Sequence, residues 1–215
     1  MTSPTVLVVA KAPVPGFAKT RVARTVGDRR AAAIASAALL DTLDAARSSG
    51  LRVVVALVGD VAHAAHSAEL VAALAPLVVV PQRGETFGER LAHAHADADE
   101  GHGVVQIGMD TPQVTAADLT DAADLLATHT SVLGPAADGG WWLLAVRHAA
   151  QAEGLVDVVM SADDTGARTL EVLGNDVAMV RTLRDMDEWP DAVAIADAHP
   201  HLRLHAAVHD SMVGS

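Results

Sequence analysis

The 215-residue sequence contains no cysteine and no tyrosine, and its only aromatic residues are two phenylalanines and three tryptophans. Without cysteine, the chain has no disulfide bonds, thiol nucleophiles or thiolate metal sites. No apolar run approaches the ~18 residues of a membrane-spanning helix, and the N-terminus lacks the charged region and apolar core of a signal peptide. We therefore expect a cytoplasmic protein that does not bind membranes.

Basic residues are also scarce, since 15 lysines and arginines face 27 acidic residues and the formal net charge is -12. A protein that binds duplex DNA needs a basic surface, so we do not expect a nucleic acid partner. Six of the basic residues nevertheless lie within residues 1–30, among them both lysines of the chain, Lys11 and Lys19. A local positive site in an acidic protein suits a small anion such as a nucleotide phosphate.

Apolar runs rich in valine and leucine alternate with alanine-rich helical segments, a pattern typical of an α/β fold with a sheet covered on both faces. We expect strands at residues 5–10, 51–58, 77–80, 103–107, 131–134, 140–146 and 176–181. We expect helices at residues 28–49, 61–74, 88–99, 115–128, 163–173 and 190–198. The strand after the glycine pair at 139–140 need not be parallel to the others, so a mixed sheet is predicted. Residues 1–198 are interpreted as one domain and residues 199–215 as an exposed tail.

In open α/β sheets, ligands bind beyond the carboxyl ends of the strands, so the loops there are the places to search. The first such loop, KAPVPGFAKTR, is not a Walker loop, because Ala18 stands directly before Lys19 where that motif needs glycine, and Pro13 replaces the earlier glycine. Pro13 restricts the backbone of this loop, and Gly16 provides a position of backbone freedom within it. Lys11, Lys19 and Arg21 are candidate phosphate ligands, and a solvated basic turn is the alternative.

Two further loops carry acidic residues. Asp110 follows an apolar strand in VVQIGMDTP and is a candidate Mg²⁺ ligand, with an ordinary turn residue as the alternative. Asp185 and Asp187 follow the last predicted strand, and in extended backbone their spacing directs both carboxylates to one side. They could share a cation, or they could be acids favoured before a helix N-terminus.

The segment GPAADGGWWLLAV contains a turn signal followed at once by two tryptophans. Gly139 and Gly140 would allow a ligand to approach the backbone closely. Trp141 and Trp142 should point to opposite faces of a strand, so that one packs in the core while the other lines a cleft. A hairpin turn with two packing tryptophans is the alternative reading for Asp138 and its neighbours.

The segments AKAPVPGFAKTRVA, GETFGERL, IGMDTP, GPAADGGWWLLAV and RDMDEWPDA occur in this order over roughly residues 5–198. This ordered set resembles a family of small bacterial proteins with the glycosyltransferase-A (GT-A) fold, which are labelled glycosyltransferases and include members of arsenosugar-related and selenium-related clusters. It is similar, more distantly, to phospholactate guanylyltransferase and to molybdenum cofactor nucleotidyltransferases. The resemblance implies a three-layer αβα sandwich with a mixed, mostly parallel sheet.

The resemblance also implies roles for individual residues. The residues that match the nucleotide-phosphate loop are Lys11, Lys19 and Arg21, with Pro13 and Gly16 between them. Those that match a stretch near the nucleobase or ribose include Gln82, Gly84 and Arg90. Asp110, Asp185 and Asp187 match metal ligands, and Asp138 with Gly139 and Gly140 matches the acceptor-side loop. Trp141 and Trp142 stand where the family has tyrosines.

Together these residues predict a transferase that uses Mg²⁺ or Mn²⁺ and moves a sugar from a nucleotide sugar to a small acceptor. Asp138 would be the base for an acceptor hydroxyl, and Lys19 would face the metal-bound pyrophosphate. The first alternative is nucleotidyl transfer, in which a phosphorylated substrate attacks a nucleoside triphosphate and releases pyrophosphate. This alternative is favoured by the absence of a second aspartate after Asp110. The second alternative is a nucleotide-binding protein without catalysis.

The chain contains 11 histidines, several at helical spacing. His201, His205 and His209 lie four residues apart, and His63 and His66 three residues apart. Such spacing suits a Zn²⁺ site. Because the C-terminal tail is expected to be exposed, we interpret these side chains as solvated histidines.

Overall fold

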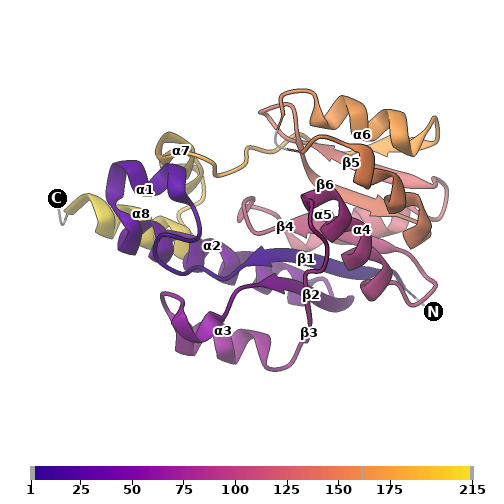
Figure 1. The fold of residues 1–215 in the computed structure, drawn as a ribbon. Coiled ribbons are helices and arrows are strands. Elements are labelled where there is room, and N and C mark those ends of the chain that lie inside the picture. The colour runs from indigo at the N-terminus through magenta and orange to yellow at the C-terminus, as the bar shows by residue number, and fades with distance from the viewer. Residues whose placement is uncertain (1–2, 161, 214–215) are drawn as a thin grey trace.

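A computed structural model describes residues 3–160 and 162–213 and contains a seven-stranded sheet at its centre (Figure 1). The strand order is β3-β2-β1-β4-β6-β5-β7. β6 pairs antiparallel with both β4 and β5, and the other pairings are parallel. The strands are β1 (Thr5–Lys11), β2 (Arg52–Val58), β3 (Val78–Pro81), β4 (Val104–Gly108), β5 (Ser131–Pro135), β6 (Trp141–Val146) and β7 (Val177–Met179).

Helices cover both faces of the sheet. Their bounds are α1 (Thr20–Val26), α2 (Asp28–Ser48), η1 (Val61–His63), α3 (Ser67–Leu74), α4 (Phe87–Ala98), α5 (Ala116–Leu125), η2 (Ala149–Asp157), α6 (Thr165–Leu173), α7 (Trp189–Ala198) and α8 (Arg203–Val213). Apolar side chains of α2, α3 and α5 form one core with the sheet, and those of α4, η2 and α6 form the other. The predicted three-layer α/β sandwich and mixed sheet are confirmed.

The central strands are apolar on both sides because both of their faces are covered. In β1, Val6 and Val8 pack into the first core, while Leu7 and Val9 pack into the second. β1 lies between β2 and β4, so the loops that leave β1 and β4 diverge at the carboxyl edge of the sheet. Such a switch point is where open α/β sheets bind ligands.

The segment 61–74, predicted as one helix, is broken in the structure into η1 and α3. His66 adopts a left-handed backbone conformation with φ 54°. The Ala65 amide donates to the Pro13 carbonyl oxygen at 3.0 Å, and the Ser36 hydroxyl donates to the Ala65 carbonyl oxygen at 2.6 Å. These contacts to other segments replace the hydrogen bonds that a continuous helix would make.

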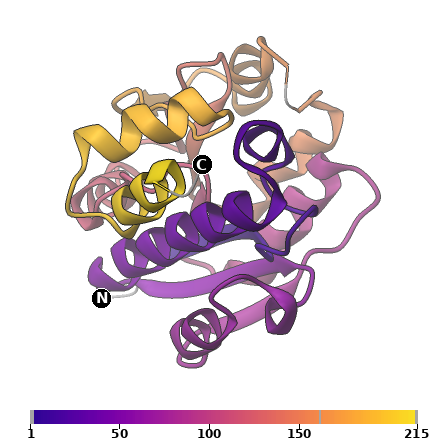
Figure 2. The same ribbon diagram turned by 90° about the vertical axis from the view of Figure 1, so that its left-hand side faces the viewer.

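The prediction of an exposed tail after residue 198 is wrong for the described part of that segment, because α8 packs beside α2 (Figure 2). Leu204 and Val208 are fully buried in a third core between α1, α2, α7 and α8. The carboxylate of Asp41 on α2 accepts the Arg203 and Leu204 amides at 3.0 Å each. These bonds satisfy two of the free N–H groups at the N-terminus of α8.

Among the described residues, no helix has both the length and the apolar character required to cross a membrane.

Candidate active site

Two adjoining cavities lie at the switch point, beyond the carboxyl ends of β1 and β4. The first, with a volume of about 670 Å³, is lined by Lys11, Lys19, Arg21 and Arg90, and we call it the basic cavity. The second, of about 530 Å³, is lined by seven carboxylates, and we call it the acidic cavity. These carboxylates belong to Asp110, Asp138, Asp163, Asp185, Asp187, Glu188 and Asp191. Asp110, Asp187 and Arg21 line both cavities, so the two form one continuous site.

Lys19 lies at the boundary between the cavities. Its ammonium group is 2.8 Å from an Asp110 carboxylate oxygen and 3.7 Å from one of Asp187, and it donates to the Met186 carbonyl oxygen. The side chain is only 8% exposed, and the backbone is left-handed at φ 51°. A non-glycine residue in this conformation indicates local strain, which is common at functional sites. The predicted phosphate ligand Lys19 is thus an ion-pair partner of two predicted metal ligands.

Asp185 lies beside this ion pair. One of its carboxylate oxygens, Oδ1, is buried and makes no hydrogen bond within residues 3–160 and 162–213. Burial, followed by the charges of Asp110, Asp138 and Asp187, raises the pKa of Asp185 to about 8. The structure therefore brings the three predicted metal ligands together, and one of them holds an unsatisfied buried oxygen.

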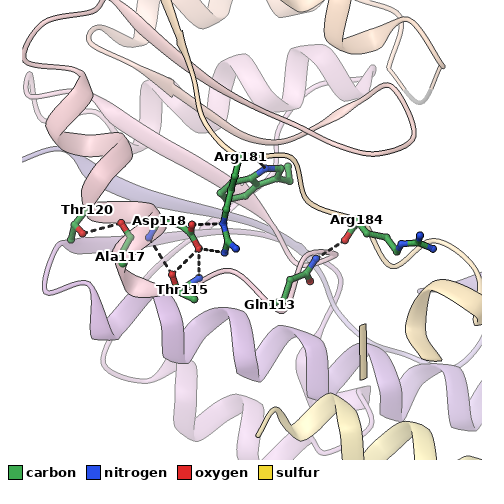
Figure 3. Close-up of polar contacts among 8 residues, drawn as sticks. Gln113, Thr115, Ala117, Asp118, Thr120, Arg181 and Arg184 are labelled. Atoms are coloured by element: carbon green, nitrogen blue, oxygen red, sulfur yellow. Dashed lines mark hydrogen bonds and ion pairs between the residues drawn. The ribbon is translucent and has the colours of Figure 1, made fainter. Parts of the chain in front are cut away.

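The segment that carries Asp185 and Asp187 is fixed by contacts with α5 and with the loop that precedes α5 (Figure 3). The Arg181 guanidinium donates to both carboxylate oxygens of Asp118 at 2.7 and 2.6 Å. The Gln113 amide donates to the Arg184 carbonyl oxygen at 2.7 Å. Burial would raise the pKa of Asp118, but the bonds from Arg181 and Thr115 outweigh it and lower the pKa.

A backbone hydrogen bond also joins the two acidic loops, since the Met186 amide donates to the Asp110 carbonyl oxygen at 2.7 Å. The Trp142 indole N–H donates to the Arg181 carbonyl oxygen at 2.9 Å, and Trp142 is 2% exposed. Trp142 is therefore mainly a core residue that supports this segment. Trp141 is half-buried, and both tryptophans are among the residues that line the acidic cavity.

Lys11 and Arg90 are the cations of the basic cavity that make no ion pair among the described residues. The Lys11 ammonium lies 3.9 Å from the centre of the Phe17 ring. The Arg90 Nε is buried without a hydrogen-bond partner in the described part of the chain. Gln82 donates its amide hydrogens to the Ala10 and Ala56 carbonyl oxygens at 2.8 and 2.9 Å. Its amide oxygen is left to accept from a ligand.

Asp138 lies in the turn before β6 and lines the acidic cavity. Its Oδ1 accepts the Gly140 amide at 2.9 Å, which orients the carboxylate. Gly139 has φ 91°, and a Cβ there would lie 2.0 Å from the Asp163 carbonyl oxygen. Gly139 is therefore required by backbone packing, whereas Gly140 lines the acidic cavity.

Three other predicted residues shape the loops around the basic cavity and are not among its described lining residues. Pro13 is buried and accepts the Ala65 amide. Gly16 has φ 76°, and Gly84 has φ 128° with no space for a Cβ beside Glu89. Their part in nucleotide binding stays a prediction, and in the structure their contacts are with the protein.

A buried polar pair that no sequence pattern indicated lies beside the acidic cavity. His95 of α4 is fully buried, and its Nε2 lies 2.8 Å from the Gln106 amide oxygen. Because an amide oxygen only accepts, His95 Nε2 carries the hydrogen, and the Gln106 NH₂ is left as a donor for a ligand in the cavity that Gln106 lines. Burial lowers the pKa of His95 to about 4, so its ring is neutral at pH 7.

We expect His95 to make the protein sensitive to acid. Its pKa is about 4 in the folded state and near 6.5 when unfolded, so its contribution is present above pH 6.5 and is lost as the pH falls towards 4. The free energy of unfolding should fall by up to about 1.4 kcal/mol per pH unit in this window from this group. Urea unfolding at pH 7.5, 6 and 5 measures this slope. His95→Gln should flatten it and His93→Gln, an exposed change on the same helix, should not; equal slopes in all three proteins would contradict the assignment.

Comparison with solved structures confirms the predicted GT-A-like fold. A candidate nucleotide-diphospho-sugar transferase from Desulfovibrio desulfuricans G20 matches with a TM-score of 0.85 and 24% identity, over 99% of this chain and 96% of that chain. Rv0371c from Mycobacterium tuberculosis H37Rv, in complex with manganese, has a TM-score of 0.55 and 22% identity, over 90% of this chain and 98% of that chain. A cytidylyltransferase from Leptospira borgpetersenii serovar Hardjo-bovis has a TM-score of 0.59 and 14% identity, over 99% and 93% of the two chains.

No curated protein matches the sequence significantly. Among protein families, residues 40–162 match the family described as "Uncharacterized protein conserved in bacteria (DUF2064)". The matched segment is more than half of the chain and runs from α2 to the loop before α6, where Met160 and Ala162 line the acidic cavity. The chain is therefore a member of the DUF2064 family and has a GT-A-like fold.

Proposed function

We propose that this protein is a transferase dependent on a divalent metal, which moves a glycosyl group from a nucleoside-diphosphate sugar to a hydroxyl group of a small acceptor. The observation that carries the proposal is the charge of the two cavities, which meet at Asp110 and Asp187. One cavity offers cations to an anionic donor. The other offers carboxylates to an uncharged or cationic acceptor.

The basic cavity would hold the nucleotide. Its volume of about 670 Å³ lies within the usual range for a small-ligand site. Lys11 and Arg90 are free to meet phosphate oxygens, whereas Lys19 and Arg21 already pair with aspartates. The amide oxygen of Gln82 would accept a hydrogen bond from the base or ribose.

Asp110, Asp185 and Asp187 would hold the metal. The residues fit such an ion, because Asp185 Oδ1 is a buried oxygen without a hydrogen-bond partner among the described residues and the Lys19 ammonium already places a positive charge between Asp110 and Asp187. Carboxylate oxygens are the ligands that Mg²⁺ and Mn²⁺ prefer. The manganese complex of the M. tuberculosis relative supports the same choice. When bound, the ion would neutralise charge on the departing diphosphate.

Asp138 would accept the proton of the acceptor hydroxyl. The acceptor oxygen then forms a bond to the anomeric carbon, and the bond between this carbon and the diphosphate oxygen breaks. Gly140 would orient the Asp138 carboxylate, and Trp141 would offer an apolar face to a sugar ring. The excess of acidic residues over the single Arg21 among the described lining residues would repel a phosphorylated acceptor.

Nucleotidyl transfer is the second candidate function. It is favoured by Pro112, which stands where a second aspartate would complete an Asp-x-Asp motif after Asp110. Several proteins of similar fold are also named as nucleotidyltransferases or cytidylyltransferases. A nucleotide-binding protein without catalysis is the third candidate, and it is disfavoured because a pure binder has less need for three metal-binding carboxylates in one cavity.

Product analysis separates these functions. The protein is incubated with Mn²⁺ and either nucleoside-diphosphate sugars or nucleoside triphosphates, together with polyhydroxylated, amino and phosphorylated acceptors. Release of nucleoside diphosphate that depends on a non-phosphorylated acceptor supports the proposal. Release of pyrophosphate from a triphosphate with a phosphorylated acceptor would overturn it in favour of nucleotidyl transfer. Nucleotide binding without either product would favour the third possibility.

We expect Arg90→Met to weaken nucleotide binding without destabilising the protein. Arg90 has a buried Nε that no described residue satisfies, so its loss removes contacts to the ligand and no internal hydrogen bond. A hydrogen bond to a charged group contributes about 1.5–3 kcal/mol, so the Kd should rise about 10- to 100-fold by calorimetry. Arg83→Met is the matched control, because Arg83 pairs with Asp97 outside the cavity at 2.6 Å. Equal nucleotide affinity of the wild type and Arg90→Met would contradict the assignment.

A further inference from the structure

A cluster of metal-ligating side chains lies at the junction of α7 and α8, apart from the two cavities. It consists of Asp197 in the last turn of α7 and of His205 and His209, one turn apart on α8. One ligand atom from each residue can be chosen so that all three lie within 4.8 Å of one another. Two imidazoles and one carboxylate make a donor set unlike the carboxylate oxygens of the candidate active site.

The hydrogen bonds of His205 favour a ligating form of its ring. Its Nδ1 lies 2.9 Å from the Ala196 carbonyl oxygen, which only accepts, so Nδ1 carries the hydrogen. The lone pair of a neutral ring is then on Nε2. Metal-ligating histidines commonly donate their second nitrogen to a backbone carbonyl in this way, which fixes the ring and its tautomer.

The other two residues are already adjacent. His209 Nε2 lies 3.1 Å from an Asp197 carboxylate oxygen, and the ring centres of His205 and His209 are 4.3 Å apart. Asp197 and His209 are partly exposed, with side-chain exposures of 58% and 42%, so an ion from solvent can reach them. Small side-chain rotations would bring the donor atoms to the distances of about 2.0–2.2 Å that Zn²⁺ requires.

The backbone of α8, which carries His205 and His209, is held in place by contacts with α2. Leu204 and Val208, adjacent in sequence to His205 and His209, are fully buried against α2. The buried carboxylate of Asp41 binds the first amides of α8. The positions of the two histidines are therefore fixed by the fold before any metal binds.

We propose that Asp197, His205 and His209 form a binding site for Zn²⁺ or a similar borderline cation such as Ni²⁺. Imidazole nitrogen favours these ions over Mg²⁺. The three protein ligands leave a further coordination position for water. A bound ion would link α8 to α7, the helix that directly follows Asp185 and Asp187. The sequence spacing grouped His201 with His205 and His209. In the structure, the ring centres of His201 and His199 are 6.0 Å apart, and Asp197 is the third residue of the cluster.

Calorimetric titration of the full chain with ZnCl₂ tests this proposal. His205→Ala and His209→Ala should each remove one Zn²⁺ per chain or weaken that site at least about tenfold, and His201→Ala should titrate like the wild type. Zn²⁺ should raise the Tm of the wild type by several degrees and leave that of His209→Ala nearly unchanged. Circular dichroism confirms that each variant is folded.

Asp185→Asn separates this site from the candidate active site, because that variant should retain the Zn²⁺ ion bound by the histidines. The proposal is overturned if His205→Ala and His209→Ala bind Zn²⁺ with wild-type stoichiometry and affinity. It is equally overturned if Zn²⁺ binding is lost in Asp185→Asn alone, since all of the bound ion would then belong to the carboxylates. Neither result depends on which reaction the protein catalyses.

Discussion

Asp185→Asn is expected to stabilise the metal-free protein at pH 8 and to abolish its stabilisation by Mn²⁺. Asp185 is a half-buried carboxyl group, and burial together with three nearby aspartates raises its pKa to about 8. Its Oδ1 finds no hydrogen-bond partner among the described residues. Asparagine has nearly the same shape and no charge, so it removes the repulsion and with it a predicted metal ligand.

The direction of the pH dependence follows from the two pKa values. An unfolded aspartate loses its proton near pH 3.8, whereas folded Asp185 holds its proton up to about pH 8. Between these values the folded state holds the Asp185 proton and the unfolded state does not, so the contribution of Asp185 to the stability of the wild type falls as the pH rises. The increase in the free energy of unfolding caused by Asp185→Asn should therefore be small at pH 4 and largest at pH 8. An increase of at least about 1 kcal/mol at pH 8 would raise the Tm by about 2–4 °C.

Thermal unfolding of the wild type and variant at pH 4.5, 6 and 8, with and without Mn²⁺, measures both effects. Asp187→Asn is the matched control, because Asp187 pairs with Lys19 and Arg21 at 3.7 and 3.3 Å. That change should also remove the Mn²⁺ effect, but it should not stabilise the metal-free protein. A Tm of Asp185→Asn that is no higher at pH 8, or that still rises with Mn²⁺, would contradict this account.

The repeating apolar segments were enough to predict the layers of the fold and most helix and strand positions. Each buried strand, such as Val104–Gly108, has a length and composition typical of a covered sheet. The missed helix α8 was also encoded, since Leu204 and Val208 are spaced one turn apart. What the sequence could not show was the partner of α8, because Asp41 lies more than 160 residues away in α2.

Asp110, Asp185 and Asp187 could be grouped from the sequence because they follow the ends of strands, and in the structure they line one cavity. The ion pairs among these side chains could not be predicted, because they join residues that lie far apart in the sequence. Lys19, which was expected to face phosphate, lies against Asp110, whereas Lys11 and Arg90 form no ion pair among the described residues. No sequence pattern pointed to Gln106 as a cavity residue. Its role becomes visible only in the structure, where the buried His95 contacts its amide oxygen.

Asp138→Asn should reduce acceptor-dependent turnover about 10²- to 10⁴-fold while nucleotide affinity stays within about threefold of the wild type. The range is that of a lost general base. The side-chain oxygen of asparagine can still accept the Gly140 amide, so the turn before β6 should keep its shape. The effect would therefore report on the proton transfer and leave the fold unchanged.

The measurement combines steady-state release of nucleoside diphosphate with calorimetric nucleotide binding. Asp163→Asn is the control, because Asp163 also lines the acidic cavity. Its backbone carbonyl oxygen, which lies close to Gly139, is unchanged by this substitution. Its turnover should remain within a few fold of the wild type. Full turnover of Asp138→Asn would exclude Asp138 as the base. Nucleotidyl transfer predicts this insensitivity, because an attacking phosphate oxygen is already anionic and needs no base.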